Sequence, residues 1–243
     1  MKIRSRRWID TTFQLLLSII GFCYWTISLV VFIIGKLFSF RKKAVPVQNT
    51  SANENIYIKF MHFVHSHGAG YTYNVMKDNI EPFAKILDIG MGSGYLAKKI
   101  QVEKHVKIIG IDVANFSKVD ITDIVFDGVT IPFPDASFDI GILAFVLHHA
   151  QDQISLLKEA KRTCKKLIVL EDNLISQFGF FLGRAHSSTF KLLYSTDTNC
   201  TYHSPEEWQV IFNKLGFTVK SISHGWKPDC FVYPVKAVKF VLE

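Results

Sequence analysis

Short apolar runs separated by charged or amphipathic segments make up most of the chain after residue 80. Four runs rich in Ile, Leu and Val have the length of strands: residues 86–89, 106–111, 140–144 and 166–170. A continuous apolar run of this length is typical of a strand that is buried on both faces, as in a parallel sheet. Between the last two runs, residues 152–164 carry apolar side chains at helical spacing. This alternation predicts an α/β fold with a doubly wound, mostly parallel sheet and helices on both faces.

Start and stop signals define a last helix. The segment S-P-E-E at positions 204–207 has a capping serine, a proline that suits the first helical position and the glutamate of a capping box. Gly216 is the expected end of this helix. Residues 217–223 and 231–240 are then predicted to form a final pair of strands.

The first predicted strand leads into a glycine-rich loop, D-I-G-M-G-S-G at positions 88–94. Glycines let the backbone approach a ligand closely, and the helix expected over residues 95–100 would point free N–H groups at it. A dinucleotide fingerprint, G-x-G-x-x-G, would require glycine where the chain has Tyr95. The loop therefore predicts a nucleotide-like ligand, without the spacing of a dinucleotide site.

Acidic residues follow the next two runs. Asp112 closes the run at 106–111, and an acid at this place can accept hydrogen bonds from both hydroxyl groups of a ribose. A further short run, separate from the four strand-length runs, ends at Asp127 and Gly128. These two residues precede I-P-F-P-D at positions 131–135. Together with the glycine loop, these residues indicate one nucleotide-like site.

These motifs resemble, in the same order, those of the class I S-adenosylmethionine-dependent methyltransferases, in the branch with quinone, sterol and other small-molecule methyltransferases. The resemblance covers roughly residues 75–225 and implies a seven-stranded, Rossmann-like sheet with one antiparallel strand. It implies S-adenosyl-L-methionine as the cofactor, with Asp88 orienting its ammonium group and Asp127 accepting from its adenine amino group. The further cofactor contacts that it implies are Gly90, Met91, Gly92, Asp112, Val113, Gly128 and Ala144.

The residues at the end of the fourth strand, L-A-F-V-L-H-H at 143–149, bear on the methyl acceptor. Methyltransferases of amide or exocyclic base nitrogens commonly have [N/D]-P-P-[Y/F] here, and cytosine C5 enzymes have Pro-Cys, so both classes are disfavoured. The L-H-H segment resembles that of many small-molecule members of the family. His148 and His149 are therefore the candidate catalytic residues, either one as general base for a hydroxyl acceptor. The alternative is that they only cap a helix or contact the edge of the cofactor.

No metal site is expected. His62, His65 and His67 lie close together in the sequence, but no cysteine or carboxylate ligand stands near them. Direct methyl transfer needs no metal. The four cysteines are far apart and form no C-x-x-C motif, which agrees with a reducing compartment.

The N-terminal region predicts a membrane anchor. Residues 13–34 carry no formal charge, and as a helix they would span about 33 Å, against a hydrocarbon core of about 30 Å. A cleavable signal peptide is one alternative, but the apolar run is longer than usual and no small-x-small cleavage site follows it. A buried core helix is a second alternative. We expect an uncleaved, single transmembrane helix.

The charge distribution supports this prediction. The chain has a net charge of +7, but eight of its 28 basic residues and one of its 21 acidic residues lie before residue 44, which leaves 20 of each in the rest. The excess positive charge therefore flanks the apolar segment, where it can pair with anionic lipid headgroups, and a nucleic-acid partner is not expected. Four basic residues on each side leave the orientation undecided. Because the cofactor is made in the cytosol, we expect the catalytic domain to face it.

The expected organisation has three parts. Residues 1–43 are the anchor with its basic flanks, residues 44–55 a polar linker, and residues 56–243 the methyltransferase domain. Within the domain, the aromatic-rich segment 56–78 and the Phe-rich insertion 174–201 are expected to cover the acceptor site. The sequence leaves the oligomeric state open.

The expected function is methyl transfer to a lipid or other small lipophilic molecule at a membrane. One alternative is a membrane-tethered protein methyltransferase, for which Glu171 and Asp172 are the only hint of an acidic acceptor groove. The other is a non-catalytic module that binds the cofactor, against which the intact motifs argue.

Overall fold

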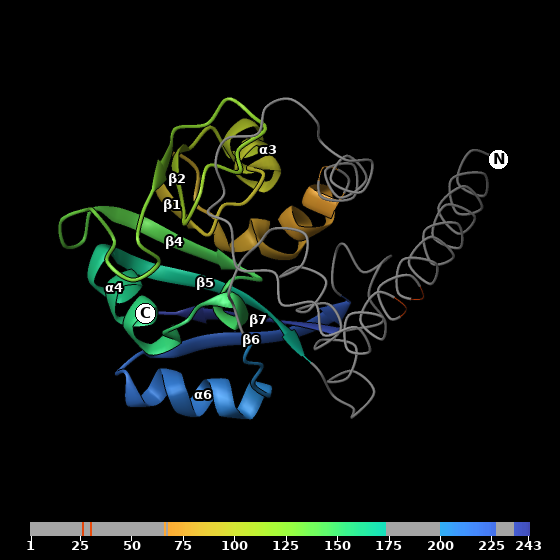
Figure 1. Cartoon of the computed structure of the whole chain (residues 1–243), viewed down its shortest axis with the longest axis vertical. Helices are drawn as coiled ribbons and strands as arrows, with labels where there is room; N and C mark the ends of the chain where they lie inside the picture. The colour runs from red at the N-terminus through yellow and green to blue at the C-terminus, as the bar shows by residue number, and fades with distance from the viewer. Residues whose placement is uncertain (1–25, 27–29, 31–65, 67, 174–199, 227–235) are drawn as a thin grey trace.

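The centre of the molecule is one seven-stranded sheet with the strand order β3-β2-β1-β4-β5-β7-β6 (Figure 1). The computed structural model describes Thr26, Val30, Ser66 and residues 68–173, 200–226 and 236–243. The strands are β1 (Lys85–Ile89), β2 (Lys107–Asp112), β3 (Asp123–Val125), β4 (Phe138–Ala144), β5 (Cys164–Asn173), β6 (Val219–Trp226) and β7 (Lys236–Leu242).

The direction of the strands confirms the expected doubly wound α/β sheet. β1 to β5 pair in parallel, and β7 is antiparallel to both of its neighbours, β5 and β6. The chain builds the sheet outwards from β1 to β3 and then crosses back to place β4 on the other side of β1. Ligands of such sheets bind at this reversal, beyond the carboxyl ends of the strands.

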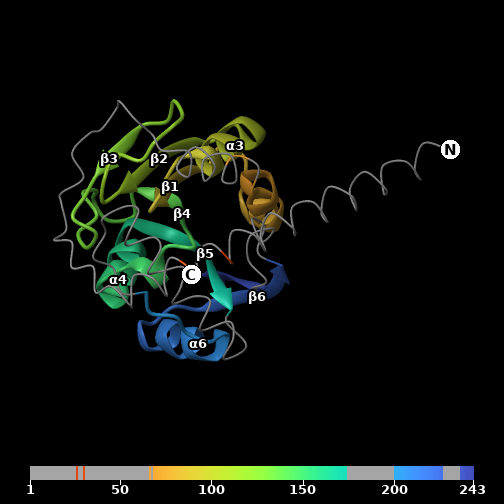
Figure 2. The same ribbon diagram turned by 45° about the vertical axis from the view of Figure 1, so that its right-hand side comes forward.

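Helices cover both faces of the sheet (Figure 2). Helical residues 68–76 and α3 (Tyr95–Lys104) share a buried cluster with one face, and α4 (Gln153–Thr163) and α6 (Pro205–Lys214) share a second cluster with the other. Two short 3-10 helices complete the described elements: η1 (Lys77–Asn79) and η2 (Leu147–His149).

β5 shows how one strand serves both layers. Leu167 and Val169 belong to the cluster under α4 and α6, and Ile168 and Leu170 belong to the cluster under α3. Successive side chains of a strand point to opposite faces, so a strand between two helical layers must be apolar at every position. This constraint explains the continuous apolar runs of the sequence.

Two predicted boundaries around β5 were wrong. α4 ends at Thr163 and β5 begins at Cys164 without an intervening turn, so the helix is shorter and the strand starts earlier than predicted. β5 also continues to Asn173, because its last three residues pair with β7. Glu171, Asp172 and Asn173 therefore lie within the strand and are buried.

The last helix begins as predicted. The Ser204 side chain accepts a hydrogen bond from the Glu207 amide at 3.2 Å, and the Glu207 carboxylate accepts one from the Ser204 amide at 2.7 Å. The capping box is thus complete. Gly216 follows the helix with φ at +74°, a conformation that favours glycine. The strands predicted after it correspond to β6 and β7.

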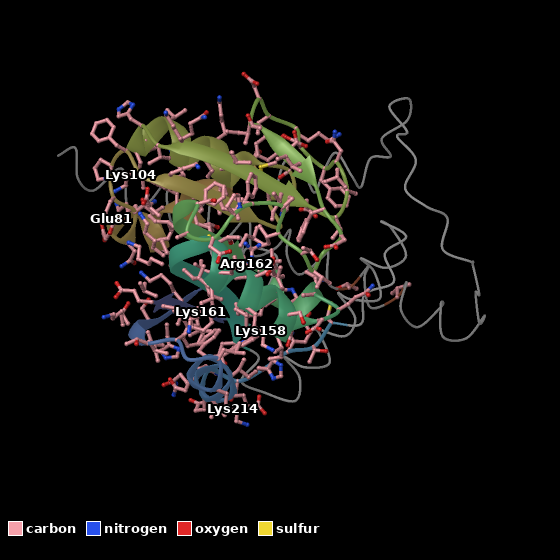
Figure 3. All side chains as sticks on the ribbon, turned by 90° about the vertical axis from the view of Figure 1, so that its left-hand side faces the viewer. Glu81, Lys104, Lys158, Lys161, Arg162 and Lys214 are labelled. Atoms are coloured by element: carbon pink, nitrogen blue, oxygen red, sulfur yellow. The ribbon has the colours of Figure 1, made fainter. Side chains whose placement is uncertain are left out.

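The I-P-F-P-D segment is fixed to α4 by one arginine. The Arg162 guanidinium donates to the carbonyl oxygens of Ile131 and Phe133 at 3.0 and 2.8 Å and to the Asp135 carboxylate at 2.8 Å. It also pairs with Glu159, whose carboxylate accepts from the Ile131 amide. Figure 3 shows Arg162 on the same face as Lys158 and Lys161. The segment is therefore structural, and it holds the loop that begins at Asp127 in place.

Several expectations fall on residues outside the described part of the chain. These are the histidine cluster at 62–67, the linker at 44–55, nearly all of the insertion at 174–201 and, except for Thr26 and Val30, the apolar segment at 13–34. Among the residues that the structure describes, no helix has the length and apolar character needed to cross a bilayer.

Candidate functional site

The glycine loop lies at the carboxyl end of β1, beside the reversal of the strand order. Its backbone turns back over β2, because the amides of Gly90 and Met91 both donate to the Ile111 carbonyl, at 2.8 and 3.1 Å. Gly90, Gly92 and Gly94 all have positive φ, at +73°, +58° and +78°. Gly94 is also the residue before α3, so the loop delivers the helix N-terminus to the same edge of the sheet.

The three glycines differ in what surrounds them. A Cβ atom on Gly90 would overlap the Val146 side chain, and one on Gly94 would lie 2.7 Å from Val119 Cγ2. A Cβ atom on Gly92 would meet nothing within 4 Å. Gly90 and Gly94 are therefore required by the packing of the protein itself. Gly92 borders open space, as expected where the loop faces a ligand.

Asp88 is a buried carboxylate in the middle of the sheet. It pairs in register with Gly110 of β2 and Ile142 of β4, and its side chain is 2% exposed. Burial, and next the nearby charge of Asp112, raise the pKa of Asp88 to about 7. A carboxylate that is costly to ionise in its own surroundings is well suited to a cationic partner, which agrees with the predicted contact to the ammonium group of the cofactor.

Asp112 ties the end of β2 to the glycine loop. Its Oδ2 accepts from the Gly92 amide and its Oδ1 from the Val113 amide, both at 2.7 Å. Burial raises the pKa of Asp112, although these two hydrogen bonds oppose the rise. A carboxylate oxygen has two acceptor positions, so each oxygen that holds a backbone amide keeps capacity for a ribose hydroxyl. Asp112 is thus both the predicted ribose acceptor and the group that fixes the loop.

The residues predicted to meet adenine lie together. Asp127 Oδ1 accepts from the amides of Val129 and Thr130 at 2.8 and 2.6 Å, and these bonds lower the pKa of this exposed carboxyl. Gly128 has φ at +83°, and a Cβ atom there would lie 3.1 Å from Val113 Cγ1. Val113 is itself 53% exposed. The structure therefore brings Val113 and the turn after Asp127 to one side of the glycine loop.

Two of the predicted cofactor contacts have other surroundings. The Met91 side chain is buried, and it occupies the space that a Cβ atom on Gly110 would need. It is a core residue, so only its backbone faces the loop. Ala144 is the last residue of β4, half-buried and paired with Leu170.

The turn after β4 holds the two candidate histidines. Phe145 opens it with φ at +60°, a strained value for a residue with a side chain. Glu171 on β5 then anchors the turn, because its Oε1 accepts from the amides of Val146 and Leu147 at 3.1 and 2.8 Å. Its Oε2 lies 2.6 Å from His148 Nδ1. Sequence reasoning missed this role of Glu171.

The segment from Cys200 to His203 packs against the same turn. The Thr201 amide donates to the His148 carbonyl at 2.9 Å, and the Tyr202 ring stacks on the His148 ring with centroids 4.9 Å apart. Cys200 Sγ lies 3.2 Å from His149 Nδ1. Gln153 joins the two parts from α4, because its side-chain amide donates to the carbonyls of Leu147 and Thr201.

The hint of an acidic acceptor groove was wrong. Glu171 and Asp172 are each only 1% exposed, and Glu171 is already engaged by two backbone amides and His148. Among the residues that the structure describes, no group of His, Cys, Asp and Glu is arranged to hold a metal ion.

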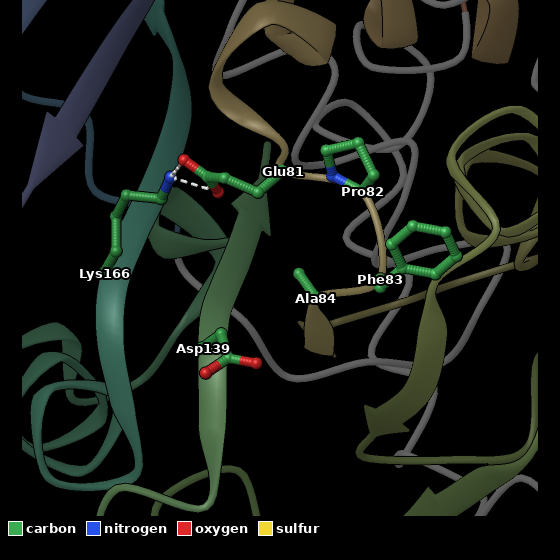
Figure 4. Close-up of a pocket in the computed structure, with 6 residues that line it drawn as sticks. All are labelled: Glu81, Pro82, Phe83, Ala84, Asp139 and Lys166. Carbon is green, nitrogen blue, oxygen red and sulfur yellow. Dashed lines mark hydrogen bonds and ion pairs between the residues drawn. The ribbon is translucent and has the colours of Figure 1, made fainter.

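A pocket at the opposite edge of the sheet is a separate feature (Figure 4). Its residues precede β1 or lie near the starts of β4 and β5: Glu81, Pro82, Phe83, Ala84, Asp139 and Lys166. Lys166 pairs with Glu81 at 2.6 Å, and Asp139 is paired with Lys165 at 2.9 Å. The pocket thus lies at the amino ends of the strands, away from the glycine loop, and its charges are neutralised within the protein.

Comparison with known proteins agrees with the geometry. Residues 87–167 match the model of a family described as a methyltransferase domain. Over 94 residues the chain is 31% identical to the 27-O-demethylrifamycin SV methyltransferase of Amycolatopsis mediterranei. This alignment covers 33% of this chain and 35% of that protein. Over 121 residues it is 27% identical to a ubiquinone/menaquinone biosynthesis C-methyltransferase of Burkholderia mallei. This alignment covers 43% of this chain and 50% of that protein. The matches thus span half or less of these two relatives.

Solved structures show the same fold. A methyltransferase from Thermotoga maritima, described as S-adenosylmethionine-dependent and a possible histamine N-methyltransferase, aligns with a TM-score of 0.57 at 21% identity over 76% of this chain and 94% of that one. An S-adenosylmethionine-dependent methyltransferase from Aquifex aeolicus aligns with a TM-score of 0.53 at 16% identity over 78% of this chain and 99% of that one. The solved structures therefore show the fold, and the matched family model identifies a methyltransferase domain over residues 87–167. These comparisons agree with S-adenosyl-L-methionine as the predicted cofactor.

The contrast between Gly90 and Gly92 gives a first prediction. We expect Gly92→Ala to fold, with only the strain of a left-handed alanine, about 1–2 kcal/mol, but to bind S-adenosylmethionine at least about tenfold more weakly because the methyl group takes ligand space. Gly90→Ala is expected to lose stability as well, because of its overlap with Val146. Titration calorimetry and thermal unfolding measure the two effects.

Gly225→Ala is the matched control for this comparison. Its Cβ atom also meets nothing within 4 Å, but it lies in β6, far along the sheet from the glycine loop. It should leave both measurements close to the wild type. Normal cofactor affinity in Gly92→Ala would show that the open space at Gly92 is not ligand space.

The raised pKa of Asp88 gives a pH dependence. The cofactor's ammonium group pairs with the ionised carboxylate, so affinity should rise about 15-fold from pH 5.5 to 7 and level off above the pKa of about 7. The folded apoprotein also keeps a proton that the unfolded chain releases from pH 4 upwards. Its stability should therefore fall as the pH rises from about 4 to 7.

Asp88→Asn is the control for both measurements, because it has no carboxyl group to titrate. Its cofactor affinity should be low and flat with pH, and its stability should exceed that of the wild type most clearly near pH 8. Calorimetry and unfolding of both proteins across pH 5.5–8 test this. A flat affinity profile in the wild type would contradict the assignment of Asp88 to the ammonium group.

Proposed function

We propose that this protein transfers a methyl group from S-adenosyl-L-methionine to a lipid or another small lipophilic molecule at a membrane. The observation that carries the transfer reaction is the convergence of Asp88, Gly92 and Asp112 at the carboxyl ends of β1 and β2. In this proposal each of the three contacts the cofactor, which the open space beside Gly92, the hydrogen bond from the Gly92 amide to Asp112 and the burial of Asp88 support.

The residues of the chain contribute mainly position and electrostatics. When bound, S-adenosylmethionine supplies a sulfonium methyl group that a nucleophilic atom can attack in line. Asp88 is placed to orient the ammonium group, Asp112 to hold the ribose and the glycine loop together, and Val113 with the turn after Asp127 to flank the adenine. Fixing two reactants in this way can remove about 7–11 kcal/mol from a barrier.

Three observations support a small acceptor over a protein. The turn after β4 has neither of the sequence motifs used for amide, base-nitrogen or cytosine methylation. Glu171 and Asp172 are buried and form no acidic groove for a Lys or Arg side chain. Two relatives are named for a rifamycin and for ubiquinone or menaquinone, which are small molecules.

The membrane part of the proposal rests on the sequence. Residues 13–34 are uncharged and have basic residues on both sides, as in a transmembrane helix with charged boundaries. We propose that this segment anchors the protein, that the linker at 44–55 connects it to the domain, and that the domain faces the cytosol, where the cofactor is made. Such an anchor would keep the domain close to acceptors dissolved in the bilayer.

The proposed acceptor class is tested by tracing the methyl group. Membranes that contain the full-length protein are incubated with methyl-labelled S-adenosylmethionine, and the products are separated into organic extract and protein precipitate. We expect the label in the organic extract and its loss with Gly92→Ala. Label confined to the precipitate would indicate a protein substrate. Absence of label from both, with normal cofactor binding, would indicate a non-catalytic module.

The proposed anchor is tested by washing the same membranes. We expect the full-length protein to stay in the pellet through 1 M salt, where the Debye length is about 3 Å, and through alkaline carbonate. A variant with Lys36, Arg41, Lys42 and Lys43 all changed to Gln is the control, and it should also stay in the pellet. Release of the wild type by salt alone would replace the anchor by peripheral electrostatic attachment.

A further inference from the structure

We infer that Glu171 is a positioning residue that makes His148, rather than His149, the general base of the methyl transfer, and that the acceptor atom is accordingly a hydroxyl oxygen. This inference rests on the proposed function and narrows its substrate class. It is carried by the contacts that Glu171 makes across the carboxyl ends of β4 and β5.

The hydrogen bonds of Glu171 determine which ring nitrogen of His148 carries the hydrogen. Oε1 accepts from two backbone amides, those of Val146 and Leu147, and Oε2 lies 2.6 Å from His148 Nδ1. An ionised carboxylate can only accept, so Nδ1–H is the donor. The neutral His148 ring then has its free electron pair on Nε2, on the side opposite Glu171. This is the arrangement in which a carboxylate orients a histidine base.

The position of the ring fits this role. His148 lies two residues after Val146, whose side chain packs against Gly90 of the glycine loop, so the ring is attached to the turn that contacts the cofactor loop. It is held by stacking on Tyr202 and by contact with His149, at centroid distances of 4.9 and 4.1 Å. The ring is 2% exposed, which excludes most of the water that would compete for a transferred proton.

His149 has different surroundings. Its Nδ1 lies 3.2 Å from Cys200 Sγ. The titratable groups that the structure places around the His148 ring are Glu171 from β5, His149 from η2 and Tyr202, with Cys200 next to His149. Glu171 is the group that lies within hydrogen-bond distance of the ring at Nδ1.

The proposed step balances without a further reactant. His148 Nε2 takes the proton of the acceptor hydroxyl, and an oxygen electron pair forms the new bond to the methyl carbon. The bond between that carbon and the sulfonium sulfur breaks, and its electron pair stays on sulfur. The products are a methyl ether, S-adenosylhomocysteine and a protonated His148, which returns its proton to solvent. An amine that is already nucleophilic would not need this base.

Glu171→Gln tests the positioning role. The glutamine oxygen can still accept from the two backbone amides, but its NH₂ group faces His148 Nδ1 and is a donor. The ring must then carry its hydrogen on Nε2, and the base is lost although the turn is kept. We expect cofactor affinity within about threefold of the wild type, methyl incorporation into a total lipid extract to fall about 100-fold or more, and the pH dependence near neutrality to disappear.

The tautomer can be read without any turnover. In the full-length protein with ¹⁵N-labelled histidine, nitrogen–proton correlation spectra should show Nδ1–H for His148 in the wild type and Nε2–H in Glu171→Gln. His148→Asn identifies the signal among the nine histidines, and its amide can still donate to Glu171. We expect His148→Asn to lose as much methyltransferase activity as Glu171→Gln. Nε2–H in the wild type, or unchanged activity in Glu171→Gln, would overturn the inference.

Gln153→Ala separates positioning from general loosening of the turn. The Gln153 side chain donates to the carbonyls of Leu147 and Thr201 and lies 2.9 Å from His203 Nε2, and none of these hydrogen bonds involves the His148 ring. We expect a higher KM for the acceptor with the pH profile retained. If Gln153→Ala and Glu171→Gln change the rate and pH profile alike, the role of Glu171 is only structural. Labelled methyl found on a nitrogen or carbon atom of the product would overturn the hydroxyl assignment. If the wild-type protein transfers no methyl group at all, the proposed function is overturned. The nitrogen–proton spectra still test the tautomer of His148 in that case.

Discussion

The whole site depends on the cost of burying carboxylates at one edge of a parallel sheet. Asp88, Asp112 and Glu171 lie in or at the ends of β1, β2 and β5, and all three are largely shielded from water. A buried charge must be compensated by hydrogen bonds or an opposite charge. Glu171 is compensated by two amides and a histidine, and Asp112 by two amides. The pKa of Asp88, about 7, shows that its own surroundings do not compensate it.

This difference separates the two acids that fix loops from Asp88, whose charge has no such compensation. Glu171 and Asp112 use their hydrogen bonds to fix loops: Glu171 fixes the turn after β4, and Asp112 fixes the glycine loop. The two loops meet where Val146 fills the space beside Gly90. The cofactor loop and the turn with the candidate histidines therefore form one packed unit, and a change in either one is felt by the other. Asp88 lies beneath this unit and has its charge available for a cationic group.

Much of this could be predicted from local sequence, because the signals are local in their physics. The positive φ values at Gly90, Gly92 and Gly94 require residues without a Cβ atom, so the glycines mark the loop directly. The capping box at Ser204 is likewise a contact between residues three apart. The length of β5 was not predictable in this way, since its last residues are extended by pairing with β7, more than 60 residues later in the chain. The burial of the Met91 side chain was likewise not predictable, because its place in the loop does not reveal which way the side chain turns.

The sequence by itself determined the class of fold, the glycine loop and the acids in or just after β1, β2 and β3, because apolar periodicity and glycine spacing report backbone geometry over a few residues. The tertiary structure decided which acid serves which purpose. Glu171 pairs with His148 only because β4 and β5 are adjacent in the sheet, and Gly92 borders open space whereas Val146 and Val119 fill the space beside its neighbouring glycines. Adjacency of strands and the filling of space arise from contacts between segments that are distant in sequence, and no local pattern of residues encodes them.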